Sequence, residues 1–155
     1  MTDHGTKPAI ILVEDDRMTL KELGTEVEAA FPQFELYTYS NERSFRGALP
    51  ELHHANPQLF LIDVMLRWDD PRPDPVSPPS DAAQEGFFRA GIRLARLIHH
   101  TPELATTPVI LFSALDKLDV ESDVTRFADG SVHSVVSKTG SFEPLFRAAR
   151  RALAS

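Results

Sequence analysis

The alternation of two kinds of segment constrains the fold of this 155-residue chain most strongly. Short runs rich in β-branched and large apolar residues, which are typical of buried strands, alternate with longer segments whose apolar residues recur at helical spacing. The strand-like runs cover residues 9–13, 34–39, 59–63, 108–113 and 132–137. The helical stripes cover residues 20–31, 45–52, 88–98, 118–127 and 142–153. This pattern predicts βα units around a parallel sheet.

Five βα units in a chain of this length predict one α/β domain over residues 1–155. We expect a three-layer αβα sandwich, a flavodoxin-like (βα)5 fold with the parallel strand order 2-1-3-4-5. In such a sheet ligands bind outside the carboxyl ends of the strands. The residues that follow each strand are therefore the first place to look for chemistry.

Composition excludes several classes of function. The chain contains no cysteine, which rules out disulfides, thiolate catalysis and Cys-based metal sites and fits a reducing compartment. No secretory signal and no apolar segment of roughly 20 residues is present, so we expect a cytoplasmic protein that does not enter a membrane. A net charge of −7 disfavours direct binding to nucleic acid.

Polar residues follow four of the five predicted strands. They are Glu14, Asp15 and Asp16 after the first strand, Asp63 in the third, Ser113 in the fourth and Lys138 after the fifth. Taken singly, Asp15 or Asp16 could cap a helix, Ser113 could be a turn hydroxyl and Lys138 a surface residue. The first and third strands are neighbours in the predicted order, so together these residues point to one site.

This set of residues predicts phosphoryl chemistry. Carboxylates without histidine or cysteine form a hard oxygen site of the kind that suits Mg²⁺. A carboxylate beside Mg²⁺ and an ammonium is a competent nucleophile toward phosphorus and would form an acyl phosphate. An unpartnered buried carboxylate costs several kcal/mol, so Asp63, within the apolar run of residues 58–67, is the predicted phosphoacceptor.

Four motifs in order resemble the receiver domain of two-component response regulators, from about residue 8 to the C-terminus. They are ILVEDD at 11–16, LIDVML at 61–66, LFSA at 111–114 and VVSKTG at 135–140. The resemblance implies phosphorylation of Asp63 by a histidine kinase or a histidine phosphotransfer protein. It implies that Mg²⁺ is bound by Glu14, Asp15, Asp63 and the backbone carbonyl of Met65. The protein would act as a signalling switch or phosphoryl carrier and not as a metabolic enzyme.

The resemblance also implies a route for the signal. Ser113, Ala114 and Lys138 would contact the phosphoryl group and couple it to the face formed by residues 118–127, 132–137 and 142–153. An unknown downstream protein, or a second copy of the chain in a homodimer, would bind to that face. Val135 stands where many receivers have an aromatic switch residue, so an aromatic flip is excluded.

Further departures concern the surroundings of the site. Met65 and Leu115 would flank the acyl phosphate, and neither can orient an attacking water, so we expect slow autodephosphorylation. Arg67 and Thr139 replace prolines that are usual in the family. Arg67 leads, with Trp68, into a Pro-rich insertion over residues 64–85, in which five prolines predict a long irregular connection.

The insertion has two readings. It could be a lid or docking strap, or a mobile surface excursion that the fold tolerates. Its composition favours the excursion, whereas the tryptophan favours a function. Two arginine clusters, Arg89/Arg93/Arg96 and Arg147/Arg150/Arg151, are interpreted as solvated helix faces.

Two other functions stay open. A phosphorylation-independent interaction module would need no intact site, although the site residues are present. A Mg²⁺-dependent aspartyl-phosphate hydrolase generally has a second acid two residues after the nucleophile, where this chain has Met65. The sequence ends directly after the last helix, which suggests either a stand-alone receiver or a piece of a longer protein.

Overall fold

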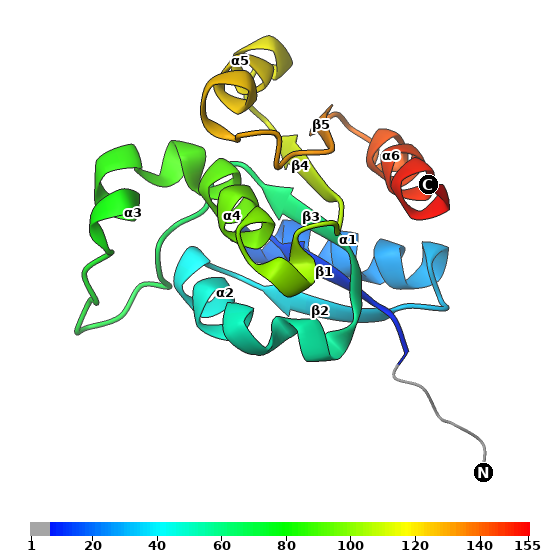
Figure 1. The fold of residues 1–155 in the computed structure, drawn as a ribbon, viewed down its shortest axis with the longest axis horizontal. Helices are drawn as coiled ribbons and strands as arrows, with labels where there is room; N and C mark the ends of the chain where they lie inside the picture. The colour runs from blue at the N-terminus through cyan, green and yellow to red at the C-terminus, as the bar shows by residue number, and fades with distance from the viewer. Residues whose placement is uncertain (1–6) are drawn as a thin grey trace.

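The computed structural model describes residues 7–155 and contains one parallel sheet. Its strands are β1 (Ala9–Val13), β2 (Glu35–Tyr39), β3 (Pro57–Asp63), β4 (Val109–Ser113) and β5 (Ser134–Ser137). They lie in the order β2-β1-β3-β4-β5, and all four neighbouring pairs are parallel (Figure 1). The predicted strand order is therefore confirmed.

Helices cover both faces of the sheet and complete the three layers (Figure 1). The α-helices are α1 (Arg17–Ala30), α2 (Glu42–Ala48), α3 (Ser80–Glu85), α4 (Ala90–His99), α5 (Lys117–Phe127) and α6 (Glu143–Ala154). The 3-10 helices are η1 (Leu49–Ala55), η2 (Phe87–Arg89) and η3 (Pro102–Leu104). Apolar residues of α1 and α6 pack on one face, and those of α2, α4 and α5 pack on the other.

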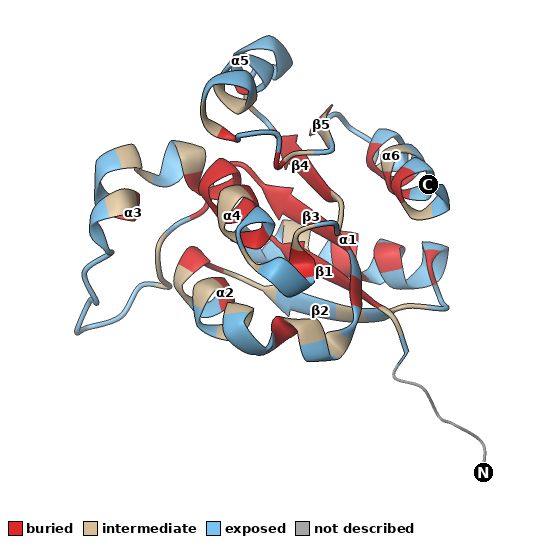
Figure 2. Cartoon of the chain, viewed as in Figure 1, coloured by how far each residue is buried: buried red, intermediate tan, exposed pale blue. Residues whose placement is uncertain are grey.

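The core lies along the central strands. Every residue of β1 is 0% exposed, and β3 is buried except at Gln58, whereas β2 at the sheet edge is mostly exposed (Figure 2). Near-continuous apolar runs are what a parallel strand covered on both faces requires. The register pairs Val13 with Ile62 and Asp63 with Phe112, so the ends of these strands lie at one edge of the sheet.

Local signals explain where the first two helices begin and end. The Asp16 carboxylate caps α1 by accepting a hydrogen bond from the Thr19 amide at 3.1 Å, which makes Asp16 a capping residue. The Asn41 side chain caps α2 in the same way. The stripe predicted over residues 45–52 is divided between α2 and η1, because Pro50 lacks the amide hydrogen that an α-helix needs there.

Some predictions about single segments are wrong. Residues 80–85 form α3 although the whole of 64–85 was expected to be irregular; the last proline, Pro79, stands at the N-cap and leaves the helix free to form. Phe88 and Leu118, placed on buried stripes, are 55% and 75% exposed. No helix of residues 7–155 is both long and apolar enough to cross a membrane.

Candidate functional site

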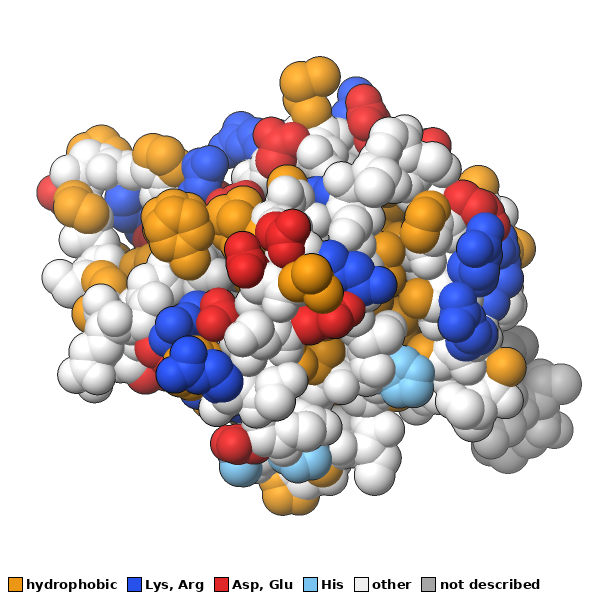
Figure 3. Space-filling view, turned by 90° about the horizontal axis from the view of Figure 1, so that it is seen from above, with side chains coloured by type: hydrophobic (Ala, Val, Ile, Leu, Met, Phe, Trp, Pro, Cys, Tyr) orange, Lys and Arg blue, Asp and Glu red, His pale blue; other side chains and the backbone are white. Residues whose placement is uncertain are grey.

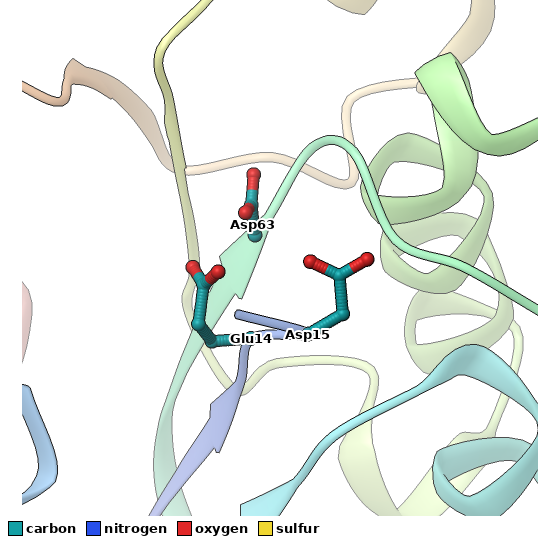
Figure 4. A group of neighbouring side chains, drawn as sticks. All are labelled: Glu14, Asp15 and Asp63. Atoms are coloured by element: carbon teal, nitrogen blue, oxygen red, sulfur yellow. The ribbon is translucent and has the colours of Figure 1, made fainter. Parts of the chain in front are cut away.

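Three carboxylates converge at the carboxyl edge of the sheet. Glu14 and Asp15 directly follow β1, and Asp63 ends β3 (Figure 4). Each offers one oxygen in a group whose members all lie within 4.8 Å of one another. Glu14 and Asp63 are 0% and 3% exposed, whereas Asp15 is half-buried. The structure therefore brings together the acidic residues that the sequence predicted.

Lys138 enters this group from the other side. Its Nζ donates hydrogen bonds to Asp63 Oδ2 at 2.8 Å and to Glu14 Oε2 at 2.9 Å. The backbone amide of Lys138 donates to the Ser113 carbonyl at 2.7 Å, which fixes the start of the loop after β5. We call Glu14, Asp15, Asp63 and Lys138 the acidic pocket.

The electrostatics of the acidic pocket favour the gain of positive charge. Burial and the neighbouring Asp63 carboxylate raise the pKa of Glu14 to about 8, although Lys138 opposes the shift. Burial alone would lower the pKa of Lys138, but its bonds to Asp63 and Glu14 outweigh this and raise it. A single ammonium thus leaves the buried carboxylates only partly neutralised.

Backbone amides hold the carboxylates in place. The Met65 amide donates to Asp63 Oδ1 at 3.1 Å, and the Asp16 amide donates to Glu14 Oε1 at the same distance. The Arg67 amide donates to Asp15 Oδ2 at 2.9 Å. Such bonds fix the orientation of ligand groups before any ligand arrives.

The residues at the end of β4 lie beside the pocket. Ser113 is buried, and its Oγ accepts a hydrogen bond from the Leu115 amide at 3.0 Å. Ala114 is exposed, and Leu115 is half-buried. Ser113 pairs in register with Ser137, directly before Lys138, so the two predicted phosphoryl contacts come from adjacent strand ends.

Helix α4 begins against the end of β3. A Cβ atom on Gly91 would clash with the Asp63 carbonyl oxygen and would lie 2.8 Å from Val64 Cα. The Gly91 amide donates to the Val64 carbonyl at 2.9 Å. A glycine is therefore required here for a close approach of two backbones, which couples the position of α4 to that of Asp63.

The donor set fits Mg²⁺ on the chemistry of its atoms. Carboxylate oxygens are the hard ligands that this ion prefers. Burial, and after it the neighbouring Asp63 carboxylate, raises the pKa of Glu14, and a bound cation would offset both causes. The side chains that could hold the ion are those of Glu14, Asp15 and Asp63.

The first part of the predicted insertion is attached to the body of the protein. The carbonyls of Arg67 and Trp68 accept hydrogen bonds from the first amides of α2, at Glu42 (3.0 Å) and Arg43 (2.8 Å). Asp69 pairs with Arg43 at 3.0 Å. We call residues 67–70 the anchor segment. Beyond it, residues 71–79 are all exposed.

Sequence reasoning missed a buried ion pair close to the pocket. Arg93 was interpreted as part of a solvated face, but it is 2% exposed, and its Nε lies 2.8 Å from Glu42 Oε2, a carboxylate that is itself 1% exposed. A signal was available, because apolar residues at 92, 94, 95, 97 and 98 occupy more than one face of the helix. The cluster Arg147/Arg150/Arg151 is exposed as predicted.

Comparison with known proteins identifies the fold. No family model matches the chain, and no curated protein matches it in sequence. Similar solved structures include the signal receiver domain of a two-component histidine kinase from Clostridium thermocellum, with TM-score 0.68, 15% identity and coverage of 95% of this chain and 98% of that one. The receiver domain of a DNA-binding response regulator from Colwellia psychrerythraea 34H gives TM-score 0.67, 19% identity and the same coverages.

A chemotaxis response regulator, CheY4 of Vibrio cholerae, is similar at TM-score 0.65 with 15% identity, over 96% of this chain and all of that one (100%). Identities this low establish a shared fold. The chain is therefore a flavodoxin-like αβα sandwich with the fold of the signal receiver domains of two-component response regulators.

Proposed function

We propose that this protein is a phosphorylation-controlled signalling switch or phosphoryl carrier that accepts a phosphoryl group on Asp63. The observation that carries the proposal is the Lys138 ammonium within 2.9 Å of both Glu14 and Asp63, inside a cluster of three carboxylates at the carboxyl edge of a receiver fold. Apolar residues of similar size at these positions would often give the fold equal or greater stability than the buried charges do. Such a partly neutralised buried cluster supports a role in binding and chemistry.

The donor would be a histidine kinase or a histidine phosphotransfer protein. One Asp63 carboxylate oxygen forms a bond to phosphorus while the phosphorus–nitrogen bond of the phosphohistidine breaks, and the released imidazole nitrogen takes a proton from solvent. Lys138 would neutralise charge on the transferred group, and Ser113 and the Ala114 amide would donate hydrogen bonds to its oxygens. When bound by Glu14, Asp15, Asp63 and the Met65 carbonyl, Mg²⁺ supplies further neutralisation.

The face formed by α5, β5 and α6 is the proposed output surface. A groove of about 390 Å³ lies over β5, and Lys117, Arg147 and Arg151 line it together with Val135. Figure 3 shows Lys and Arg side chains gathered on the side of the molecule where α6 lies, and α6 carries Arg147, Arg150 and Arg151. A downstream protein or a second copy of the chain would bind here. We propose no membrane partner and no direct nucleic-acid contact, and we infer a cytoplasmic location.

The two alternative functions, an aspartyl-phosphate hydrolase and a phosphorylation-independent module, have less support than the phosphorylation-controlled switch. A hydrolase with an aspartyl-phosphate intermediate would use an acid two residues after the nucleophile, and Met65 carries none. A phosphorylation-independent module gives no reason to retain the buried Glu14–Lys138–Asp63 arrangement. We therefore do not propose metabolic turnover.

The side chains flanking Asp63 predict a long-lived phosphoryl group. Met65 and Leu115 are both half-buried and have no group that could orient water toward phosphorus. Met65→Asn should shorten the half-life of the purified phosphoprotein in Mg²⁺ by about tenfold, in the range of one positioned polar group. A wild-type half-life of seconds would contradict the prediction.

The direct test is intact-mass spectrometry after incubation with acetyl phosphate, with and without Mg²⁺, on wild type and Asp63→Asn. We expect a single Mg²⁺-dependent phosphoryl adduct on wild type and none on the variant. Failure of folded wild type to form the adduct with either acetyl phosphate or phosphoramidate would favour the phosphorylation-independent module.

A further inference from the structure

Arg67 joins the anchor segment to the acidic pocket. Both its backbone amide and its Nε approach the same atom, Asp15 Oδ2, at 2.9 Å and 3.5 Å. The side chains of Arg67 and Asp15 are 46% and 22% exposed, so the pair lies at the rim of the pocket and is open to solvent on one side. The guanidinium therefore places a positive charge beside the Asp15 carboxylate.

The charges of the pocket are divided between two cations. Lys138 contacts Glu14 and Asp63, while Arg67 contacts Asp15. A divalent ion held by these three carboxylates would lie close to the guanidinium. Two cations on one carboxylate repel each other, and the half-exposed arginine is the one that can leave for solvent.

The other side of Arg67 leads to helix α2. Its carbonyl accepts a hydrogen bond from the Glu42 amide at 3.0 Å, and the next carbonyl, of Trp68, accepts from the Arg43 amide at 2.8 Å. Asp69 adds a salt bridge to Arg43 at 3.0 Å. A change at Asp15 is therefore transmitted along two residues of backbone to the beginning of α2.

We propose that Arg67 is a built-in counter-ion of Asp15 that competes with the divalent cation, so that metal binding displaces the guanidinium and loosens the anchor segment from α2. The inference rests on the proposed function, since it takes the acidic pocket to be a Mg²⁺ site. Arg67 acts through Asp15 and is a positioning residue. Without the guanidinium, residue 67 would be held at Asp15 by its backbone amide alone, which is a weaker tie for the anchor segment.

The first experiment is a calorimetric titration with Mg²⁺ at constant ionic strength. Arg67→Ala should bind Mg²⁺ about threefold to tenfold more tightly than wild type, since a unit charge several ångströms from a divalent ion in a solvent-exposed setting acts on that scale. Arg67→Lys, which keeps the charge, should remain within about twofold of wild type by the same reasoning. The difference between Arg67→Ala and wild type should shrink at high salt.

Arg72→Ala is the matched control. Arg72 lies in the same loop, is exposed to a similar extent (45% against 46%) and pairs with Asp69 at 3.1 Å. This variant removes the same charge from the protein without changing a contact of Asp15. The affinity of Arg72→Ala for Mg²⁺ should therefore stay near that of wild type. Equal affinities for the two alanine variants would overturn the proposal.

The fluorescence of Trp68 provides a second measurement, which reports on the anchor segment and not on the affinity for Mg²⁺. It is the only tryptophan of the chain, its indole nitrogen is buried, and the Arg46 guanidinium lies 5.7 Å from its ring. Saturating Mg²⁺ should increase acrylamide quenching of Trp68 in wild type. In the Arg67→Ala variant, acrylamide quenching of Trp68 should already be high in the absence of Mg²⁺. Quenching that does not respond to Mg²⁺ would overturn the loosening of the anchor segment.

The two proposals fail in different ways. If folded wild type shows no Mg²⁺ binding, the metal site of the proposed function is wrong, and this inference fails with it. If wild type binds Mg²⁺ and Asp63 is phosphorylated, but Arg67→Ala binds no more tightly than Arg72→Ala, only the role of Arg67 is wrong.

Discussion

Two clusters of buried charge lie side by side in this protein, and they differ in how well their charges balance. In the acidic pocket three carboxylates share Lys138 and the half-exposed Arg67. The second, which we call the arginine cluster, joins α2, α3 and α4. It matches three carboxylates with three guanidinium groups: Glu42, Asp81 and Glu85 with Arg46, Arg93 and Arg96.

The two clusters have opposite effects on the charged forms of their central groups, Arg93 and Glu14. Burial alone would lower the pKa of Arg93, but its bonds to Glu42 and Glu85 outweigh burial and raise it. In the acidic pocket, burial and Asp63 raise the pKa of Glu14 to about 8, which disfavours its charged form. A cluster whose charges are matched can be structural, whereas a cluster with an excess of carboxylates gains by binding a cation.

The largest effect on stability is expected from a substitution that breaks the arginine cluster. Arg93→Met leaves Glu42, which is 1% exposed, with only its longer contact to Arg46 at 3.2 Å, so the free energy of unfolding should fall by about 3 kcal/mol in urea titrations, the lower end for a broken buried pair. The double variant Glu42→Gln/Arg93→Met should recover most of the loss. Arg150→Met is the control, because its pair with Glu143 is 53% exposed on both sides and should contribute less than about 1 kcal/mol. Similar losses for both single variants would refute the structural role.

A smaller effect is expected where the two clusters meet, on α4. Gly91→Ala places a Cβ against the Asp63 carbonyl and should destabilise the protein by about 1–3 kcal/mol. The same variant should slow phosphorylation of Asp63, because the strand end must move. Gly47→Ala in α2 is the control: a Cβ there meets no atom within 4 Å, so this change should be neutral or stabilising by up to about 1 kcal/mol. Equal stability of the two variants would contradict the close approach.

The smallest expected effect sharpens the description of the acidic pocket. A carboxyl group whose pKa is raised on folding stabilises the protein below its ordinary pKa, and this contribution is lost as pH rises toward the folded value, about 8 for Glu14. In metal-free buffer, Glu14→Gln should therefore be more stable than wild type by about 1 kcal/mol or more near pH 8. The advantage should shrink toward pH 5.

Chemical denaturation between pH 5 and 8 in EDTA measures this difference. Exposed Glu26→Gln is the control and should give a difference that does not change with pH. A Glu14→Gln variant less stable than wild type at pH 8 would show that the charged Glu14–Lys138 pair is net stabilising and that the pocket is balanced after all.

Most of the fold and of the pocket could be predicted because their signals are local. Buried parallel strands are read from continuous apolar runs such as residues 9–13, and strand order follows from the βα alternation. Each pocket residue follows a strand, so the strand order alone brings Glu14, Asp15, Asp63 and Lys138 together. The anchor segment could not be found this way, since Arg67 and Asp15 are 52 residues apart.

The amino-acid pattern predicts the layers, the order of the strands and the carboxylates at their carboxyl edge, because periodicity and position at a strand end are properties of neighbouring residues. Which charges are buried, and which partners they have, became known from the folded structure. Arg93 and Arg147 look alike in a helical pattern, yet one pairs with Glu42, 51 residues away, and the other is exposed. The physical reason is that burial depends on what the rest of the chain packs against a side chain, and no local spacing encodes that.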